Sequence, residues 1–122
     1  MKDDLVYLRH ILDCLEAIEQ YTRGNPELFL GDRKTQKAVL RELQELAEST
    51  QRLSGQLKAT YQEIAWGSIA GFRNVLVHDY LGLSLSRIWD IVIRDLPVLR
   101  AVVAKVLSNP DATGPEDSAI PQ

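Results

Sequence analysis

Residues 32–53 read DRKTQKAVLRELQELAESTQRL, and the positions suited to burial in this stretch recur three or four residues apart. This is the spacing of an α-helix that buries one face and exposes charged residues on the others. The positions on the buried face are Val39, Leu40, Leu43, Leu46, Ala47, Thr50 and Leu53. The stretch therefore predicts a helix from about residue 32 that ends near Gly55.

The same periodicity occurs on both sides of this stretch. Residues 3–21 predict a helix. Asp3 and Asp4 are placed to cap its N-terminus and to complement the positive end of its dipole, and the Gly-Asn-Pro sequence at 24–26 breaks it. A further helix is predicted from about residue 60 to a stop before Gly82. Its core-facing stripe is Ala65, Ile69, Phe72 and Leu76.

The last periodic stretch runs from about Ser84 to Leu107 and is interrupted by Pro97, which must kink the helix or start a new one. No segment alternates with the period of two that is typical of strands, and no internal repeat is visible. The sequence predicts an all-α fold, an up-and-down bundle of four or five helices.

The chain has 122 residues, of which 45% are hydrophobic, enough for one compact core. We expect one domain over residues 1–107, followed by a disordered acidic tail over residues 108–122 with three prolines and almost no apolar residues. The opening MKDDLVYLRH has no continuous apolar segment and no stretch is long enough to cross a bilayer, so a cytoplasmic protein is expected.

The net charge of −3 is unevenly distributed. Residues 1–107 hold all 14 Lys and Arg but 14 of the 17 Asp and Glu, so the tail supplies the whole acidic excess. A neutral body gives no general attraction to polyanions. Any binding of nucleic acid must therefore depend on a specific local site.

Residues 66–80 carry the clearest functional pattern. On a helical wheel, Gly67, Gly71, Asn74 and His78 form one stripe, and Trp66, Ala70, Arg73, Val77 and Tyr80 form the next. Each glycine inside a helix costs about 1 kcal/mol relative to alanine. Two of them beside an Asn and a His suggest that another helix or a nucleic-acid strand approaches this backbone closely.

Arg73 and His78 are a candidate catalytic pair for cleavage of RNA. Metal-free cleavage needs groups that accept and donate protons, together with a cation that stabilises the developing phosphorane-like charge. Histidine titrates in the required range, and guanidinium binds phosphate in a bidentate fork. Asn74 could contact the phosphate or orient His78, and Tyr80 could donate a hydrogen bond or stack on a base.

The stretch AWGSIAGFRNVLVHDY, residues 65–80, resembles the signature of the HepT toxins, which belong to the HEPN class. Residues 41–53, 88–89 and 95–99 are similar to other helices of that family, so the resemblance covers about residues 1–107. Two positions depart from the family pattern. Ala65 stands where a proline is usual, and Ala47 stands where a glycine is usual.

The resemblance implies a homodimeric HEPN-type bundle with metal-independent endoribonuclease activity, which needs no cofactor and uses an Arg-x4-His-x-Tyr motif. It implies that the protein is the toxin of a type VII-like toxin–antitoxin pair and that this toxin cleaves RNA. Cleavage of a tRNA or an mRNA would cause growth arrest. It also implies a cognate MntA-like nucleotidyltransferase antitoxin that attaches AMP to Tyr80.

Other polar and aromatic residues are interpreted structurally. His10 is taken as a solvated helix residue without a metal-binding partner, and no metal site is predicted. Cys14 is expected to be a small buried core residue. Glu42, Glu45 and Glu48 are expected on a solvated face, with an ion pair between Glu48 and an arginine. Trp66 and Trp89 are expected to be core or dimer anchors.

Two other functions compete with the ribonuclease interpretation. A non-catalytic HEPN module would use the same helix face only to bind a nucleotidyltransferase or a nucleotide. A helical-bundle dimerisation domain would explain the core but not the two glycines beside Asn74 and His78. The joint presence of Arg73, Asn74, His78 and Tyr80 favours the ribonuclease.

Overall fold

The computed structural model of the chain describes residues 2–78 and 84–108. Within these ranges every regular element is a helix, as the periodicity predicts, so the all-α class is confirmed. The elements in chain order are α1 (Lys2–Thr22), α2 (Pro26–Leu30), α3 (Arg33–Gln51), α4 (Gly55–Thr60), α5 (Trp66–His78) and α6 (Leu85–Ser108).

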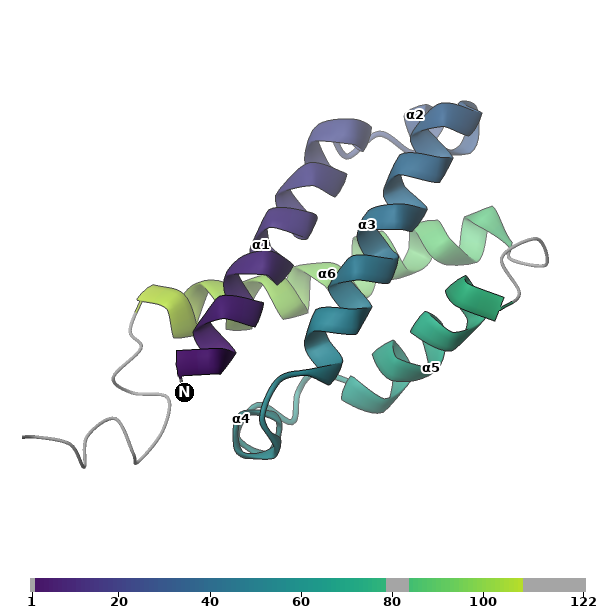
Figure 1. The fold of residues 1–122 in the computed structure, drawn as a ribbon. Coiled ribbons are helices and arrows are strands. Elements are labelled where there is room, and N and C mark those ends of the chain that lie inside the picture. Colours follow the sequence, from purple (N-terminus) through teal and green to yellow (C-terminus); the bar gives the residue numbers. More distant parts are fainter. Residues whose placement is uncertain (1, 79–83, 109–122) are drawn as a thin grey trace, which may run out of the picture.

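Helices α1 and α3 lie side by side and run in opposite directions, and α6 crosses behind them (Figure 1). Helix α5 packs against the other side of α3. The two short helices close the ends of the bundle, α2 where α1 turns into α3 and α4 where α3 turns toward α5 (Figure 1). Helix α3 is therefore the central element that connects the α1 side of the molecule to α5.

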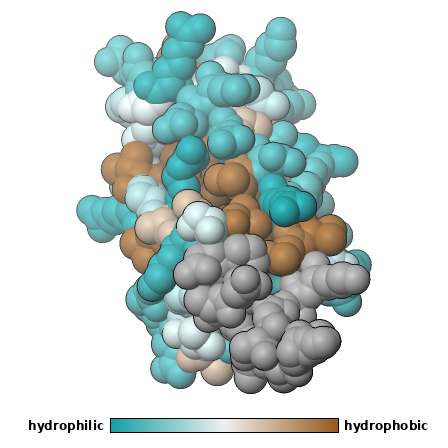
Figure 2. All heavy atoms as spheres, turned by 90° about the vertical axis from the view of Figure 1, so that its left-hand side faces the viewer, coloured by the Kyte–Doolittle hydropathy of each residue, from teal (hydrophilic) through white to brown (hydrophobic). Residues whose placement is uncertain are grey.

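The core fills the space between α1, α3 and α6. Its completely or almost completely buried side chains come from all three helices and include Leu8, Ile11, Leu43, Leu46, Ile88, Leu99 and Val103. All seven positions predicted to be buried in residues 32–53 are buried, six of them on α3 and Leu53 just after its end. On the face where α1 begins, hydrophobic residues gather across the middle, with hydrophilic residues above and below them (Figure 2).

Helix α2 was not predicted, because the Gly-Asn-Pro sequence was interpreted only as a break. The Asn25 side chain caps this helix by accepting a hydrogen bond from the Glu27 backbone N–H at 2.9 Å, and Pro26 occupies the first helical turn. Both are known N-terminal signals. The helix buries Phe29 completely, and its ring stacks on Trp89 with centroids 5.6 Å apart. Trp89 was predicted to anchor either the core or a dimer, and the structure confirms that it is a core residue.

Asp3 and Asp4 both lie in the first turn of α1, where their charge complements the helix dipole, but the predicted capping role of Asp4 was wrong. The Asp4 carboxylate is buried and accepts two hydrogen bonds from Ser54, one from the backbone N–H at 2.8 Å and one from Oγ at 2.6 Å. The Ser54 hydroxyl in turn accepts a hydrogen bond from the Leu57 N–H and caps α4. One carboxylate thus joins the start of α1 to the start of α4.

The predicted start of the third long helix near residue 60 was wrong. Residues 55–60 form the separate helix α4, and α5 begins only at Trp66. The indole Nε1 of Trp66 donates to the carbonyls of Lys58 and Tyr61, each at 3.1 Å, and so fixes the turn between the two helices. Ala65 precedes α5 and is exposed, so its placement on the core stripe was also wrong.

Helix α6 continues through Pro97, so the prediction that this proline might start a new helix was wrong. The helix reaches Ser108, and residues 109–122 lie outside the described part, so the disordered tail and the domain boundary stay predictions. None of the described helices has the length and apolar character needed to span a membrane.

Candidate functional site

Helix α5 places Arg73 against α3. The Arg73 Nη2 donates to Glu48 Oε2 at 2.9 Å, and the two side chains are 28% and 48% exposed. The Arg73 Nε is buried and has no hydrogen-bond partner among the described residues. The predicted ion pair of Glu48 with an arginine is confirmed, and its partner is the arginine of the candidate catalytic pair. This ion pair fixes where the guanidinium lies.

The structure describes the other candidate site residues only in part. Asn74 follows Arg73 on α5 and is exposed to solvent. His78 is the last residue of that helix, and its side chain lies outside the described part. Tyr80 also lies outside the described residues. The convergence of Arg73 and His78 in space therefore stays a prediction.

The glycine stripe of α5 faces open space. Gly67 and Gly71 are exposed, and a Cβ atom added at either position would meet no described atom within 4 Å apart from its chain neighbours and the nearby backbone of α5 itself. Packing among the described residues does not explain the glycines. No described residue fills the space above them.

An apolar pocket adjoins the same helix. A cavity of about 200 Å³ opens between α3, α5 and α6, with Ile69 and Phe72 on one wall and Leu96 and Val98 on another. Ile69 and Phe72 are only partly buried, and Val98 is 42% exposed. Solvent-facing apolar side chains grouped around a hollow are typical of a binding surface.

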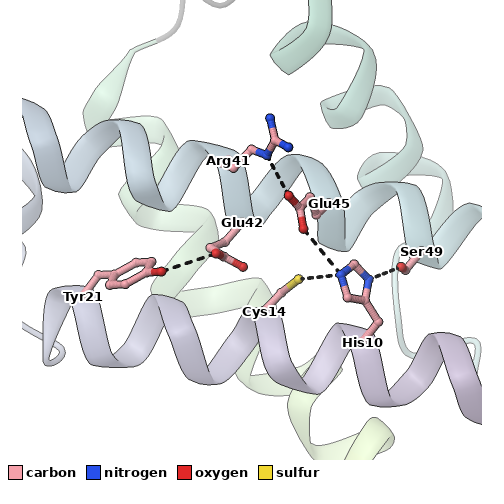
Figure 3. Close-up of polar contacts among 7 residues, drawn as sticks. All are labelled: His10, Cys14, Tyr21, Arg41, Glu42, Glu45 and Ser49. Atoms are coloured by element: carbon pink, nitrogen blue, oxygen red, sulfur yellow. Dashed lines mark hydrogen bonds and ion pairs between the residues drawn. The ribbon is translucent and has the colours of Figure 1, made fainter.

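His10 is a helix residue that is only partly solvated, because its ring also contacts three other side chains, which corrects the prediction that it has no such partner. Its ring lies between α1 and α3, with Nδ1 2.6 Å from Ser49 Oγ and Nε2 3.8 Å from Cys14 Sγ and 3.5 Å from Glu45 Oε1 (Figure 3). His10 and Cys14 are four residues apart, which places both on one side of α1. That spacing was visible in the sequence but was not recognised as a metal-ligand pattern.

The acidic residues of α3 are engaged by neighbours rather than only solvated. Glu45 accepts a hydrogen bond from Arg41 Nε at 2.7 Å, and this bond lowers the pKa of Glu45, so it is ionised near neutral pH. Glu42 accepts from the Tyr21 hydroxyl at 3.5 Å. Burial and then the negative charge of Glu42 raise the pKa of the Cys14 thiol to about 12. Cys14 is buried, as expected, and is a protonated thiol rather than a nucleophile at neutral pH.

Known proteins resemble nearly the whole chain. It is 36% identical over 101 residues to "Probable ribonuclease HepT" from Thermococcus cleftensis, which covers 82% of this chain and 92% of that protein. It is 31% identical over 110 residues to a "Putative RNase" from Caldanaerobacter subterraneus, which covers 89% of this chain and 98% of that protein. No solved structure gives a significant match.

A third relative is longer. The chain is 32% identical over 111 residues to a "Gamma-glutamylcyclotransferase and putative RNase" from Methanocaldococcus jannaschii, and the match covers 90% of this chain but spans only 50% of the length of that protein. The family described as "Ribonuclease HepT-like" matches residues 11–106, which include all but the first turns of α1 and the last residues of α6. The chain therefore belongs to the HepT-like ribonuclease family.

Proposed function

We propose that this protein is an endoribonuclease toxin of the HEPN/MNT type that cleaves RNA, such as a tRNA or an mRNA, without a metal ion. The observation that carries the proposal is the Arg73–Glu48 ion pair, which holds a guanidinium on α5 five residues before a histidine, in a chain of a ribonuclease family. Arg73 and His78 are the catalytic residues of the proposed site.

The chemistry follows from the two side-chain types. Arg73 receives the scissile phosphate and stabilises the charge that develops on it. His78 transfers protons, accepting one from the 2′-hydroxyl or donating one to the leaving 5′-oxygen. Asn74 supports the phosphate or the histidine, and Tyr80 donates a further hydrogen bond or stacks on a base.

Glu48 acts through Arg73. The carboxylate binds Nη2, and a guanidinium has five N–H donors, so other donors stay available for a phosphate. The cost is a negative charge near the position that RNA must occupy. Glu48 is therefore a positioning residue: it orients the guanidinium, and its negative charge weakens the binding of RNA.

Two molecules complete the site in this proposal. Proton transfer at both oxygens needs more groups than one Arg–His pair supplies, and a two-fold dimer would bring a second pair to the same cleft. The open space over Gly67 and Gly71 and the neighbouring apolar pocket give α5 a surface on which a second chain can pack. This face is the proposed dimer interface.

Tyr80 is the proposed control point. A cognate MntA-like nucleotidyltransferase would transfer AMP from ATP to the phenol oxygen, releasing pyrophosphate. The product carries a purine and a phosphodiester anion, which would block the cleft and pair with Arg73. With such a partner and ATP, AMP should map to Tyr80, and Tyr80→Phe should escape this inactivation. Modification at another residue would contradict the switch.

The direct test is cleavage of RNA by the purified chain and its variants. Arg73→Ala and His78→Ala should each lower the cleavage rate by about 10²–10³-fold, because loss of a contact to transition-state charge has this effect. Arg87→Ala, an exposed arginine on α6, is the matched control and should cleave normally. A wild-type chain that binds the nucleotidyltransferase but cleaves no RNA would support the non-catalytic HEPN module instead.

A further inference from the structure

A second set of chemically reactive side chains lies between α1 and α3. His10 Nε2, Cys14 Sγ and a carboxylate oxygen of Glu45 all lie within 4.8 Å of one another (Figure 3). Two of these residues come from α1 and the third from α3. An imidazole, a thiol and a carboxylate are each common ligands of zinc.

The distances fit a single small ion. With Zn–N and Zn–S distances of about 2.1 and 2.3 Å, a tetrahedral ion holds its nitrogen and sulfur ligands about 3.6 Å apart and its nitrogen and oxygen ligands about 3.4 Å apart. The observed separations are 3.8 Å from His10 Nε2 to Cys14 Sγ and 3.5 Å from His10 Nε2 to Glu45 Oε1. The third separation, between Cys14 Sγ and a carboxylate oxygen of Glu45, is within 4.8 Å, so the Glu45 side chain turns toward Cys14 when all three atoms bind one ion.

The histidine ring is already held in the required orientation. Its Nδ1 lies 2.6 Å from the hydroxyl oxygen of Ser49, which is buried, and this contact directs Nε2 toward Cys14 and Glu45. A metal on Nε2 leaves the proton on Nδ1, which then donates to Ser49 Oγ. Metal-binding histidines usually have such a partner for the second ring nitrogen.

Charge and access also suit a cation. Glu45 is ionised, and Glu42 adds a second negative charge beside Cys14. His10 and Glu45 are 43% and 38% exposed in their side chains and line a surface groove, so an ion can enter from solvent. When it binds, the thiol proton leaves to solvent, and the thiolate and one carboxylate balance the two positive charges.

We propose that His10, Cys14 and Glu45 bind one Zn²⁺ ion that joins α1 to α3, with water in the fourth position. The soft thiolate selects zinc over magnesium or calcium, which prefer oxygen ligands. Glu45 binds the metal through Oε1, while Oε2 accepts the hydrogen bond from Arg41. The site takes no part in the proposed RNA chemistry and does not depend on it.

The test uses the full chain after treatment with a chelator, titrated with Co²⁺ as a spectroscopic probe and then with Zn²⁺. We expect one Co²⁺ per chain, a near-ultraviolet thiolate-to-cobalt band, displacement by Zn²⁺, and a rise in melting temperature with zinc. Ser49→Ala should weaken binding by about 10–100-fold, because the histidine then loses the hydrogen-bond partner that orients its ring. A titration without the thiolate band overturns the proposal.

Variants locate the site. His10→Gln and Glu45→Gln change half-exposed side chains and should fold normally but bind no stoichiometric Co²⁺, and Cys14→Ser should lose the thiolate band. Glu27→Gln, an exposed acid on α2, is the matched control and should bind as the wild type does. Stoichiometric binding that survives His10→Gln and Glu45→Gln would overturn the assignment. In chelator these two variants should still cleave RNA, so the two proposals fail separately.

Discussion

The bond between Asp4 and Ser54 offers a quantitative test of how the fold is held together. Asp4 is 3% exposed, and both carboxylate oxygens accept hydrogen bonds from a residue 50 positions away. Asp4→Ala removes both acceptors and leaves the Ser54 N–H and hydroxyl without them. Hydrogen bonds to a charged group are worth about 1.5–3 kcal/mol each, and partial access of water to Ser54 reduces the total.

We therefore expect Asp4→Ala to lower the free energy of unfolding by about 3 kcal/mol. For a chain of this size that corresponds to a fall of roughly 10–15 °C in melting temperature. Urea unfolding followed by circular dichroism measures the free energy, and calorimetry measures the temperature.

Asp3→Ala is the matched control. Asp3 stands next to Asp4 in the first turn of α1 but is exposed. If the carboxylates acted only through the helix dipole, each substitution would cost about 0.5 kcal/mol and the two would be equal. A double-mutant cycle with Ser54→Ala should give a coupling energy of at least about 1 kcal/mol. Equal effects of Asp3→Ala and Asp4→Ala, or no coupling, would refute the reasoning.

Two further predictions concern the candidate site. Glu48→Ala should lower kcat for RNA cleavage by about 10–100-fold, because the Arg73 guanidinium loses its fixed position. KM should not rise, because the substitution removes a carboxylate near the bound phosphate. Steady-state kinetics measures both, Glu27→Ala is the control, and a raised KM with unchanged kcat would contradict the positioning role. Gly71→Trp should fold, because no other described element fills the space over Gly71, but its side chain should block the proposed dimer interface. Circular dichroism should show the fold and light scattering a monomer. Ala104→Trp, on the exposed side of α6, is the control and should leave the dimer intact. A dimeric Gly71→Trp protein would place the interface elsewhere.

The long helices could be predicted from sequence because their burial pattern is local and repetitive. Every position predicted to be buried in residues 32–53 is buried, and Leu8, Ile11 and Ile18 form the same kind of face on α1. Helix α2 was also predictable, because Asn25 and Pro26 are standard signals of a helix start. It was overlooked because the same residues also end helices.

Contacts between distant residues could not be predicted in this way. The role of Asp4 depends on Ser54, and the surroundings of His10 depend on Ser49 and Glu45 of another helix. Periodicity shows which face of a helix is buried but not which residue of the next helix lies opposite. The partner of Glu48 was uncertain for the same reason, although an arginine was expected.

The chemistry of cleavage tests the central proposal most directly. A defined RNA is incubated with the purified chain in excess EDTA, and the 3′ ends of the products are identified by mass spectrometry. Attack by the 2′-hydroxyl, assisted by Arg73 and His78 of the dimer without a metal ion, predicts cleavage in the chelator and products that end in 2′,3′-cyclic phosphate. Activity that disappears in EDTA and returns with Mg²⁺, with products that carry a 3′-hydroxyl, would contradict it.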